Sequence, residues 1–349
     1  MISALSFAVM SFAVMNLIIA AEISLSRKNA LGILDFRYAP YALGDSFTWL
    51  TNVQIKAHIH GHKSIDLVLI SLREKRARRH QPYITSYNQV QVMEGLLPAF
   101  LTCPSVNSLR IFQSKNKVSQ RILGAILTHA ASWPTLKSHF KRLLDPASHS
   151  CINAFYAKHK WLPRLQAPAG FKSETQYFRS RYIGQRFPIV INIRQRALTH
   201  DPAALHRDSS ADAWYDFLAR AHRRWSNAAF ILVGGFSEWE RRFAHLPNVI
   251  IPRMFGFGLG HELTLLFEGA PFFGTSSGFS AAATFSNTPY AITKVEHQTA
   301  ANIGLPVGSE RYPFALHHQW LNWENETGSL LSDLFERLWL AADANRRGG

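Results

Sequence analysis

The sequence predicts an α/β protein in which two doubly wound, Rossmann-like domains face each other across a cleft, with an apolar helix at the N-terminus. After residue 28, short runs rich in β-formers alternate with longer helical stretches, a pattern typical of parallel strands joined by helices. The alternation occurs twice, on either side of an irregular stretch that contains Pro163, Pro168 and Gly170. The 349 residues are enough for two domains with separate cores.

In the first half, short apolar runs predict strands and longer amphipathic stretches predict helices. Strands are expected at 32–36, 65–70 and 109–112, and helices at 45–60 and 90–101. Further helical segments are expected between 117 and 145, and residues 146–185 are predicted to be irregular.

The second half repeats this scheme more clearly. Strands are expected at 188–193, 229–233, 249–251, 271–273 and 289–293. Helices are expected at 211–224, 237–243 and 259–268, after the turn at 274–278, and at 330–342, where apolar spacing suits packing back across a domain.

These patterns divide the chain into five parts. They are an apolar helix and candidate membrane anchor (1–28), an N-terminal Rossmann-like domain (29–150), a linker or crossover (151–185), a C-terminal Rossmann-like domain (186–325), and a helix that packs back with a tail (326–349). Ligands of such domains bind at the carboxyl ends of the strands, so we expect the site there.

The N-terminal stretch from residue 2 to 21 is almost entirely apolar or small and has about the length that spans a bilayer. Arg27 and Lys28 follow it and no basic residue precedes it, so the positive-inside rule leaves the remaining chain in the cytoplasm. A helix packed on the globular body and a true start at Met10 or Met15 are the alternatives.

The formal charge of +15 and the pI near 10 call for a polyanionic partner. Basic residues gather at 73–80, at 115–142 and from 179 to 224, where a generic basic surface or a membrane-facing patch is expected. No helix-turn-helix, zinc-finger or RNP-like pattern supports a nucleic-acid partner. Cys103 and Cys151 lie far apart without metal-ligand spacing, so the sequence indicates neither a disulfide framework nor a structural zinc site and favours a reducing compartment.

The stretch 272–283 carries the clearest chemical signal, because an apolar strand runs into a hydroxyl-rich turn that begins an alanine-rich helix. First-turn N–H groups, the helix dipole and the hydroxyls of Thr275, Ser276 and Ser277 can converge on a phosphate, while Gly274 and Gly278 permit close approach. The alternative is an ordinary strand-to-helix connection with a serine N-cap.

Three segments together carry a family resemblance: residues 38–45 with Gly44-Asp45 after the first strand, residues 263–278 with the hydroxyl turn, and residues 287–292 with the Pro-led strand. Their order and spacing resemble the bacterial heptosyltransferase-type glycosyltransferases of the GT-B fold and uncharacterised relatives from surface-polysaccharide gene clusters. The Ile193-Arg194 pair at a strand end is similar, more remotely, to fucosyltransferases.

The resemblance implies an inverting, metal-independent transfer of a sugar from a nucleotide diphosphate to a hydroxyl of a glycan or lipid-linked glycan precursor in surface polysaccharide biosynthesis, at the inner face of the cytoplasmic membrane and without a cofactor. The pyrophosphate would lie on the turn from Thr275 to Gly278, and the first domain would hold the acceptor. Asp45 falls where the family has its general base, a role that suits a carboxylate; its alternative is a helix N-cap.

Arginines at the strand ends of the second domain are candidates for neutralising the diphosphate leaving group. Arg194 is the first of them, with its neighbour Gln195 in the expected donor site and with Arg196 and Arg253 as alternatives, although each could equally form a surface or interdomain salt bridge. Glu262 is a candidate nucleotide contact, with helix capping as its alternative. The adjacent pair His317-His318 does not have the geometry of a metal site.

The sequence also departs from the family. Ser276 stands where the family turn has an acid, Phe279-Ser280 replaces the expected histidine, and no lysine-bearing motif follows the strand at 188–193. The donor sugar is therefore left open. A degenerate, non-catalytic GT-B-like protein that binds glycan or nucleotide, and a sugar-nucleotide epimerase or hydrolase, are the alternative functions.

Overall fold

The computed structural model describes residues 29–71, 81, 84–85, 87–113, 131–135, 147–195 and 206–347. The expectations for the N-terminal helix, for the basic run at 73–80 and for Arg196 lie outside these residues. Within the described ranges, no helix is long and apolar enough to cross a membrane.

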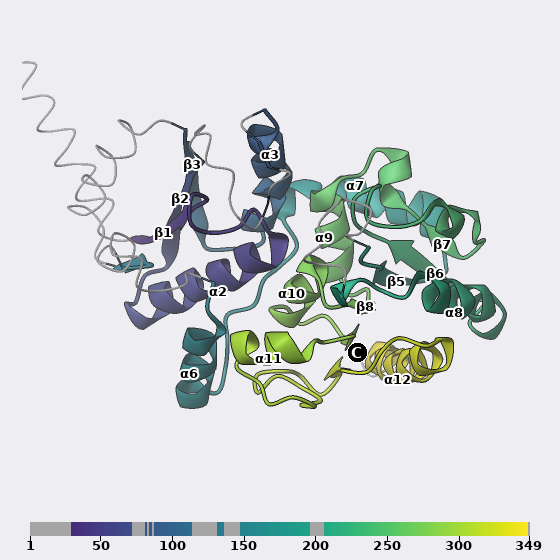
Figure 1. The fold of residues 1–349 in the computed structure, drawn as a ribbon. Coiled ribbons are helices and arrows are strands. Elements are labelled where there is room, and N and C mark those ends of the chain that lie inside the picture. The colour runs from purple at the N-terminus through teal and green to yellow at the C-terminus, as the bar shows by residue number, and fades with distance from the viewer. Residues whose placement is uncertain are drawn as a thin grey trace, which may run out of the picture.

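The first half is built on a four-stranded parallel sheet with the order β3-β2-β1-β4. Its elements are β1 (Asn29–Asp35), α2 (Leu43–Ile59), β2 (Ser64–Ile70), α3 (Gln89–Phe100), β3 (Val106–Phe112), β4 (Ala131–Trp133) and α6 (His149–His159). Helix α2 packs on the sheet, where the indole N–H of Trp49 donates a hydrogen bond to the carbonyl of Ile33 at 3.1 Å. Most of this helix is buried because it lies between the sheet and the second half (Figure 1).

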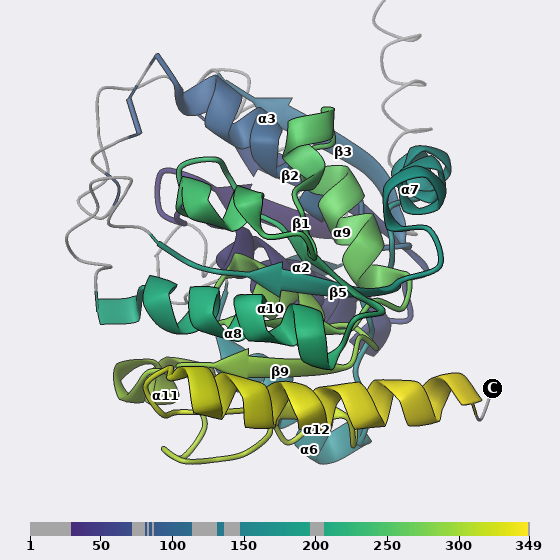
Figure 2. The same cartoon turned by 90° about the vertical axis from the view of Figure 1, so that its right-hand side faces the viewer.

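The second half is built on a six-stranded parallel sheet with the order β10-β9-β8-β5-β6-β7. Its strands are β5 (Phe187–Asn192), β6 (Ala228–Leu232), β7 (Val249–Ile250), β8 (Phe272–Thr275), β9 (Tyr290–Thr293) and β10 (Gln319–Leu321). Its α-helices are α7 (Lys172–Phe178), α8 (Ala211–Arg224), α9 (Leu259–Phe267), α10 (Gly278–Thr284), α11 (His297–Ile303) and α12 (Gly328–Arg347). Helices α8 and α12 lie together on the outer face of this sheet, as Figure 2 shows, where Phe217 and Phe335 pack against Phe230.

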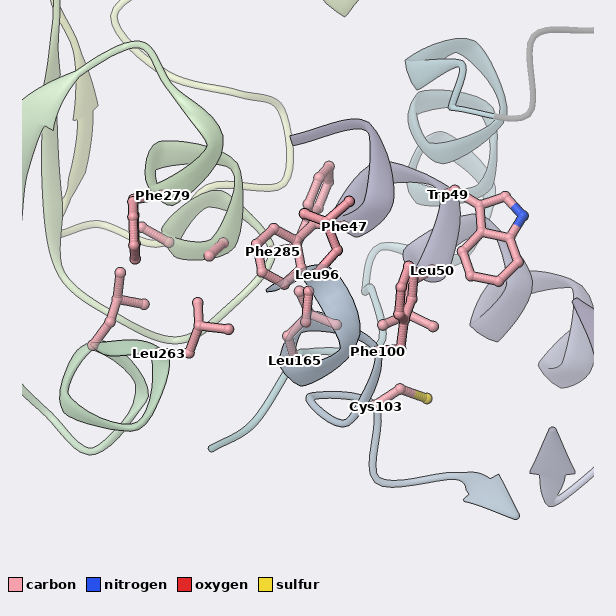
Figure 3. Packing of buried hydrophobic residues seen from close by; sticks show 14 of the residues in the cluster. Phe47, Trp49, Leu50, Leu96, Phe100, Cys103, Leu165, Leu263, Phe279 and Phe285 are labelled. Atoms are coloured by element: carbon pink, nitrogen blue, oxygen red, sulfur yellow. The ribbon is translucent and has the colours of Figure 1, made fainter. Parts of the chain in front are cut away.

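One apolar core runs from the first half into the second. It joins α2 and α3 to α9 and α10, and Figure 3 shows its side chains meeting between these helices: Phe47, Leu96, Phe100, Leu165, Leu263, Phe279 and Phe285. Arg164 in the connection between the halves donates to the carbonyls of Thr284, Ser286 and Phe314 at 3.3, 3.2 and 2.8 Å. Apolar packing therefore joins the two halves, and the Arg164 guanidinium fixes the connection to the second half.

The two parallel sheets and their strand-helix alternation are confirmed, but three local expectations are wrong and two elements are absent from the prediction. Residues 146–185 contain α6 and α7, because the prolines that suggested a loop lie between these two helices. Strand β4 lies in the region expected to be helical, and a 3-10 turn at Arg241–His245 replaces the helix expected at 237–243. Helix α11 and strand β10 have seven and three residues, too short to give a periodic signal in the sequence.

Candidate functional site at the cleft between the halves

A cleft of about 430 Å³ lies between the two halves at the carboxyl ends of their strands. The first half contributes the beginning of α2, from Ala42 to Thr48, together with His149 at the start of α6. The second half contributes the β8–α10 turn and the residues that follow β5 and β9. This is the edge at which ligands of doubly wound folds bind.

The first turns of α2 and α10 meet in this cleft. A Cβ atom added to Gly278 would lie 2.7 Å from the Cβ of Leu43, so glycine is required for the two helix ends to come this close. One added to Gly44 would lie 3.7 Å from Ala281, an ordinary contact. The positive ends of two helix dipoles therefore lie at the same cleft.

The hydroxyls of the β8–α10 turn have different roles. Ser277 is the N-cap of α10: its side chain accepts a hydrogen bond from the N–H of Ser280 at 3.3 Å, and its own N–H donates to Ser280 Oγ at 2.8 Å. The interpretation as a strand-to-helix connection with a serine N-cap is thus confirmed. Ser276, Ser277 and Gly278 also line the cleft, so the N-cap residue Ser277 is itself part of the cleft wall.

Thr275 faces away from the cleft, into a buried hydroxyl network. It is 0% exposed and donates to Glu326 Oε1 at 2.8 Å, and Thr293 donates to the same oxygen at 2.6 Å. The other carboxylate oxygen accepts from the N–H of Ser210 at 2.8 Å, and Ser209 forms a hydrogen bond with Thr275. The expectation that the Thr275 hydroxyl contacts a phosphate therefore disagrees with its position, because Glu326 already takes this hydroxyl.

Asp45 lies in the first turn of α2, at the third helical residue, and lines the cleft. The N-cap of α2 is Ala42, which makes no side-chain capping bond, so the alternative of Asp45 as an N-cap is wrong. Placed in the first turn, the carboxylate interacts favourably with the helix dipole. Asp45, which the sequence singled out, therefore lies on the side of the cleft that the first half contributes, opposite the hydroxyl turn.

Arg194 follows β5 and also lines the cleft. Its guanidinium lies 3.6 Å from the Asp208 carboxylate, and its side chain is 12% exposed. Its backbone is held on both sides by Ser209, since the N–H of Arg194 donates to Ser209 Oγ at 2.9 Å and the N–H of Ser209 donates to the Arg194 carbonyl at 2.7 Å. Gln195 does not line the cleft; its amide nitrogen donates to Glu240 at 3.1 Å.

Arg253 forms an ion pair with the buried carboxylate of Glu262, and neither residue lines the cleft. Two guanidinium nitrogens of Arg253 donate to the two carboxylate oxygens of Glu262 at 2.9 Å each, and the N–H of Gly234 donates to Glu262 at 3.2 Å. Burial raises the pKa of Glu262, and the guanidinium of Arg253 opposes this shift. The expected nucleotide contact of Glu262 disagrees with its burial, since its side chain is 0% exposed. Glu262 does not cap its helix either, because Gly258 is the N-cap. The salt-bridge alternative for Arg253 is confirmed.

Several cleft residues are absent from the sequence prediction. Asn192 ends β5 and donates to the carbonyl of Val233 at 3.0 Å, and Glu238 accepts from the N–H of Gly235 at 3.0 Å. Both follow a strand of the second half, so their positions alone could have marked them. Arg207 is the second arginine that lines the cleft, 3.8 Å from the Glu296 carboxylate.

His149 is the other cleft residue that the sequence did not reveal. Its ring stacks with Tyr312 at a centroid distance of 6.0 Å, and its Nε2 lies 3.5 Å from Thr48 Oγ1. The Nδ1 atom is buried and has no hydrogen-bond partner among the residues that the structure describes. Burial lowers the pKa of His149 to about 4, so the ring is neutral near pH 7. A neutral imidazole can donate to one hydroxyl and accept from another.

The described part of the chain contains no group of three or more His, Cys, Asp or Glu side chains that could hold a metal ion. The rings of His317 and His318 lie 4.6 Å apart, and His318 lies within 3.3 Å of the carbonyl of Asn287.

Comparison with known proteins identifies the fold. No protein-family model and no curated protein matches the sequence. Among solved structures, the chain is similar to a glycosyl transferase family 9 protein from Veillonella parvula DSM 2008, with a TM-score of 0.53 and 13% identity over 90% of this chain and 97% of that one. It is also similar to the ADP-heptose lps heptosyltransferase II of E. coli, with a TM-score of 0.53 and 12% identity over 90% of this chain and 99% of that one. These likenesses show that the chain has a heptosyltransferase-like GT-B fold.

Proposed function

We propose that the protein is a glycosyltransferase that moves a sugar from a nucleoside diphosphate to a hydroxyl of a glycan or glycolipid precursor at the inner face of the cytoplasmic membrane. One observation carries this proposal: the cleft of a GT-B fold brings a carboxylate of the first half, Asp45, opposite the helix start and Arg194 of the second half. The solved structures with this fold are themselves described as glycosyltransferases.

The second half supplies the groups that bind a diphosphate. The start of α10 brings a positive dipole and the N–H of Gly278 to the cleft, and Ser276 adds a hydroxyl. Arg194 and Arg207 line the same space, 3.6 Å from Asp208 and 3.8 Å from Glu296 respectively. A guanidinium has five N–H donors in a planar fork that matches the oxygens of a phosphate. These groups would stabilise the leaving diphosphate without a metal ion.

The first half supplies the general base. The hydroxyl oxygen of the acceptor attacks the anomeric carbon, the bond from that carbon to the diphosphate oxygen breaks, and Asp45 takes the hydroxyl proton. A single displacement from the face opposite the leaving group inverts the anomeric configuration. His149, on the same side of the cleft, would orient the acceptor through its neutral ring.

Donor binding is tested by calorimetric titration of the full chain with ADP, UDP, GDP, CMP and dTDP and with their sugars. ADP is the first choice because the E. coli relative is described as an ADP-heptose transferase. We expect one nucleotide to bind, and we expect Arg194→Ala to weaken it at least tenfold, since a charge-assisted hydrogen bond is worth about 1.5–3 kcal/mol. The control is Arg223→Ala, an exposed arginine of α8 far from the cleft. Folded protein that binds none of these ligands contradicts the proposal.

A non-catalytic binding protein is the second candidate, favoured by Ser276, which gives the turn no acid. Asp45→Asn separates the two functions. For a transferase it should leave donor affinity within about twofold and lower turnover by 10²–10⁴-fold, the range of general-base catalysis. Turnover that is unchanged in Asp45→Asn would remove Asp45 from the mechanism.

A further inference from the structure

A second feature of the molecule lies at the other end of α2, away from the cleft. The segment from Lys56 to Lys63, with the sequence KAHIHGHK, ends α2 and turns into β2. The segment 157–161, with the sequence AKHKW, ends α6. Together they contain four lysines and four histidines, and neither contains an acidic residue. We call these two segments the basic edge.

Ring contacts hold the two segments against each other. The His58 ring meets the Trp161 ring edge-on at a centroid distance of 4.6 Å and lies 6.5 Å from the ring of His159. Trp161 also packs edge-on against the buried ring of Phe155 at 5.4 Å. The basic edge is therefore one surface, although its segments are about 100 residues apart in the sequence.

Large apolar side chains are exposed at the same edge. Trp161 is 40% exposed and Ile59 is 56% exposed. Leu101, in the turn that leads to β3, is 48% exposed, and this turn is joined to β2 where the N–H of Ile65 donates to the carbonyl of Ser105 at 2.8 Å. An edge that combines lysines with exposed aliphatic and indole groups is amphipathic.

The N-terminal segment of the chain also joins the fold at this edge. Asn29, the first residue of β1, pairs with Ser64, the residue after Lys63. Twenty-eight residues precede Asn29, and residues 2–21 are almost all apolar or small in sequence. The most apolar segment of the sequence is therefore attached next to the basic edge.

We propose that the basic edge docks the protein on an anionic bilayer surface. Lysines attract anionic headgroups, while Trp161, Ile59 and Leu101 fit the headgroup region, where indole and aliphatic groups are favoured. A nucleic acid explains the lysines but not the exposed aliphatic groups or the attachment of an apolar segment at the same edge. Lys56 follows Thr48, the last residue of α2 that lines the cleft, by eight residues, so the basic edge begins about 12 Å along the helix from the cleft and docking leaves the cleft open. This inference does not depend on the proposed function, because binding to vesicles is measured without an assay of sugar transfer.

The test compares the partitioning of full-length variants onto vesicles of phosphatidylcholine alone and of phosphatidylcholine mixed with phosphatidylglycerol. One variant replaces Lys56, Lys63, Lys158 and Lys160 by glutamine. Each lysine near an anionic surface strengthens binding by roughly fivefold, so this variant should bind mixed vesicles at least a hundredfold more weakly than the native protein. The matched control replaces four exposed arginines of the second half by glutamine, with the same change in net charge: Arg181, Arg220, Arg223 and Arg241. It should stay within about threefold, because charges far from the docked surface are screened.

Trp161→Ala tests the apolar component. It should weaken binding at high ionic strength, where the lysine contribution is screened. Circular dichroism and the thermal midpoint establish that each variant is folded. The proposal is overturned if the native protein does not prefer mixed vesicles, or if the lysine and arginine variants lose binding equally. It is also overturned if the native protein binds a single-stranded oligonucleotide in place of vesicles, or if the lysine variant binds both vesicle types as the native protein does, since residues 1–28 would then account for binding.

Discussion

Replacing Gly278 by alanine tests the contact on which the cleft depends. The added Cβ would lie 2.7 Å from the Cβ of Leu43 and 3.1 Å from its Cγ and Cδ2, where carbon atoms prefer about 3.5–4.0 Å. A rotamer change of Leu43 cannot relieve this clash, because the nearest atom is its Cβ, which is fixed to the backbone at the start of α2. Overpacking of this kind costs about 1–3 kcal/mol, which exceeds the gain of roughly 0.5–1 kcal/mol that alanine usually brings to a helix.

Urea titration measures the free energy of unfolding. Titration with the nucleotide that the native protein binds measures the change in nucleotide affinity at the cleft. We expect Gly278→Ala to lower both stability and nucleotide affinity, because relief of the clash moves the two helix ends apart. Gly44→Ala is the matched control: its Cβ would have ordinary contacts at 3.7 Å, so stability should change by less than about 1 kcal/mol. Adding Leu43→Gly should recover part of the loss in Gly278→Ala, with a coupling of about 0.5–3 kcal/mol. Equal behaviour of Gly278→Ala and Gly44→Ala would refute the reasoning.

Three further predictions concern buried polar groups. Arg253→Ala should lower the free energy of unfolding by about 3–5 kcal/mol in urea titrations, because it leaves the 0% exposed carboxylate of Glu262 without its cation; a loss below about 1 kcal/mol would show that this pair is not a buried unit. Glu326→Ala should cost about 2–4 kcal/mol in the same measurement, because the hydroxyl of Thr275 and the other donors of Glu326 lose their acceptor, whereas Glu326→Gln keeps one acceptor and should cost less. Because burial lowers the pKa of His149 to about 4, below its value near 6.5 in the unfolded chain, the unfolded state binds the proton first as the pH falls. The difference in stability between the native protein and His149→Phe should therefore be constant above pH 7 and shift against the native protein by roughly 2–3 kcal/mol between pH 6.5 and 4; a pH-independent difference would contradict the buried, neutral ring.

The sequence predicts the bounds of those elements that a local pattern sets, such as an N-cap at the start of a helix and an apolar face that packs on the sheet. Helix α8 begins and ends where expected, because Ser210 caps it and its apolar face packs on the sheet. Residues 146–185 show the limit of such reasoning. There, Pro163 and Pro168 suggest a loop, yet they separate two helices that make contacts distant in sequence, such as the hydrogen bond from Asn153 of α6 to the carbonyl of Ile303.

The candidate site was predictable where a residue ends a strand or begins a helix. Arg194 and Ser276 were found in this way and Asp45 through the family resemblance, and all three line the cleft. The partners of each side chain could not be predicted, because they come from far along the chain. Thr275 is turned inward by Glu326, 51 residues later, and His149 lies in a helix whose sequence gave no sign of chemistry.

Hydrogen exchange with and without the nucleotide found by titration tests the central claim most directly, because it locates the ligand on the chain. We predict slower exchange of the backbone amides in residues 276–281, with the next strongest protection in the first turn of α2, and no such protection in Arg194→Ala at the same ligand concentration. Protection that is confined to other segments, or binding that leaves the amides of the β8–α10 turn unchanged, would contradict a donor site in this cleft.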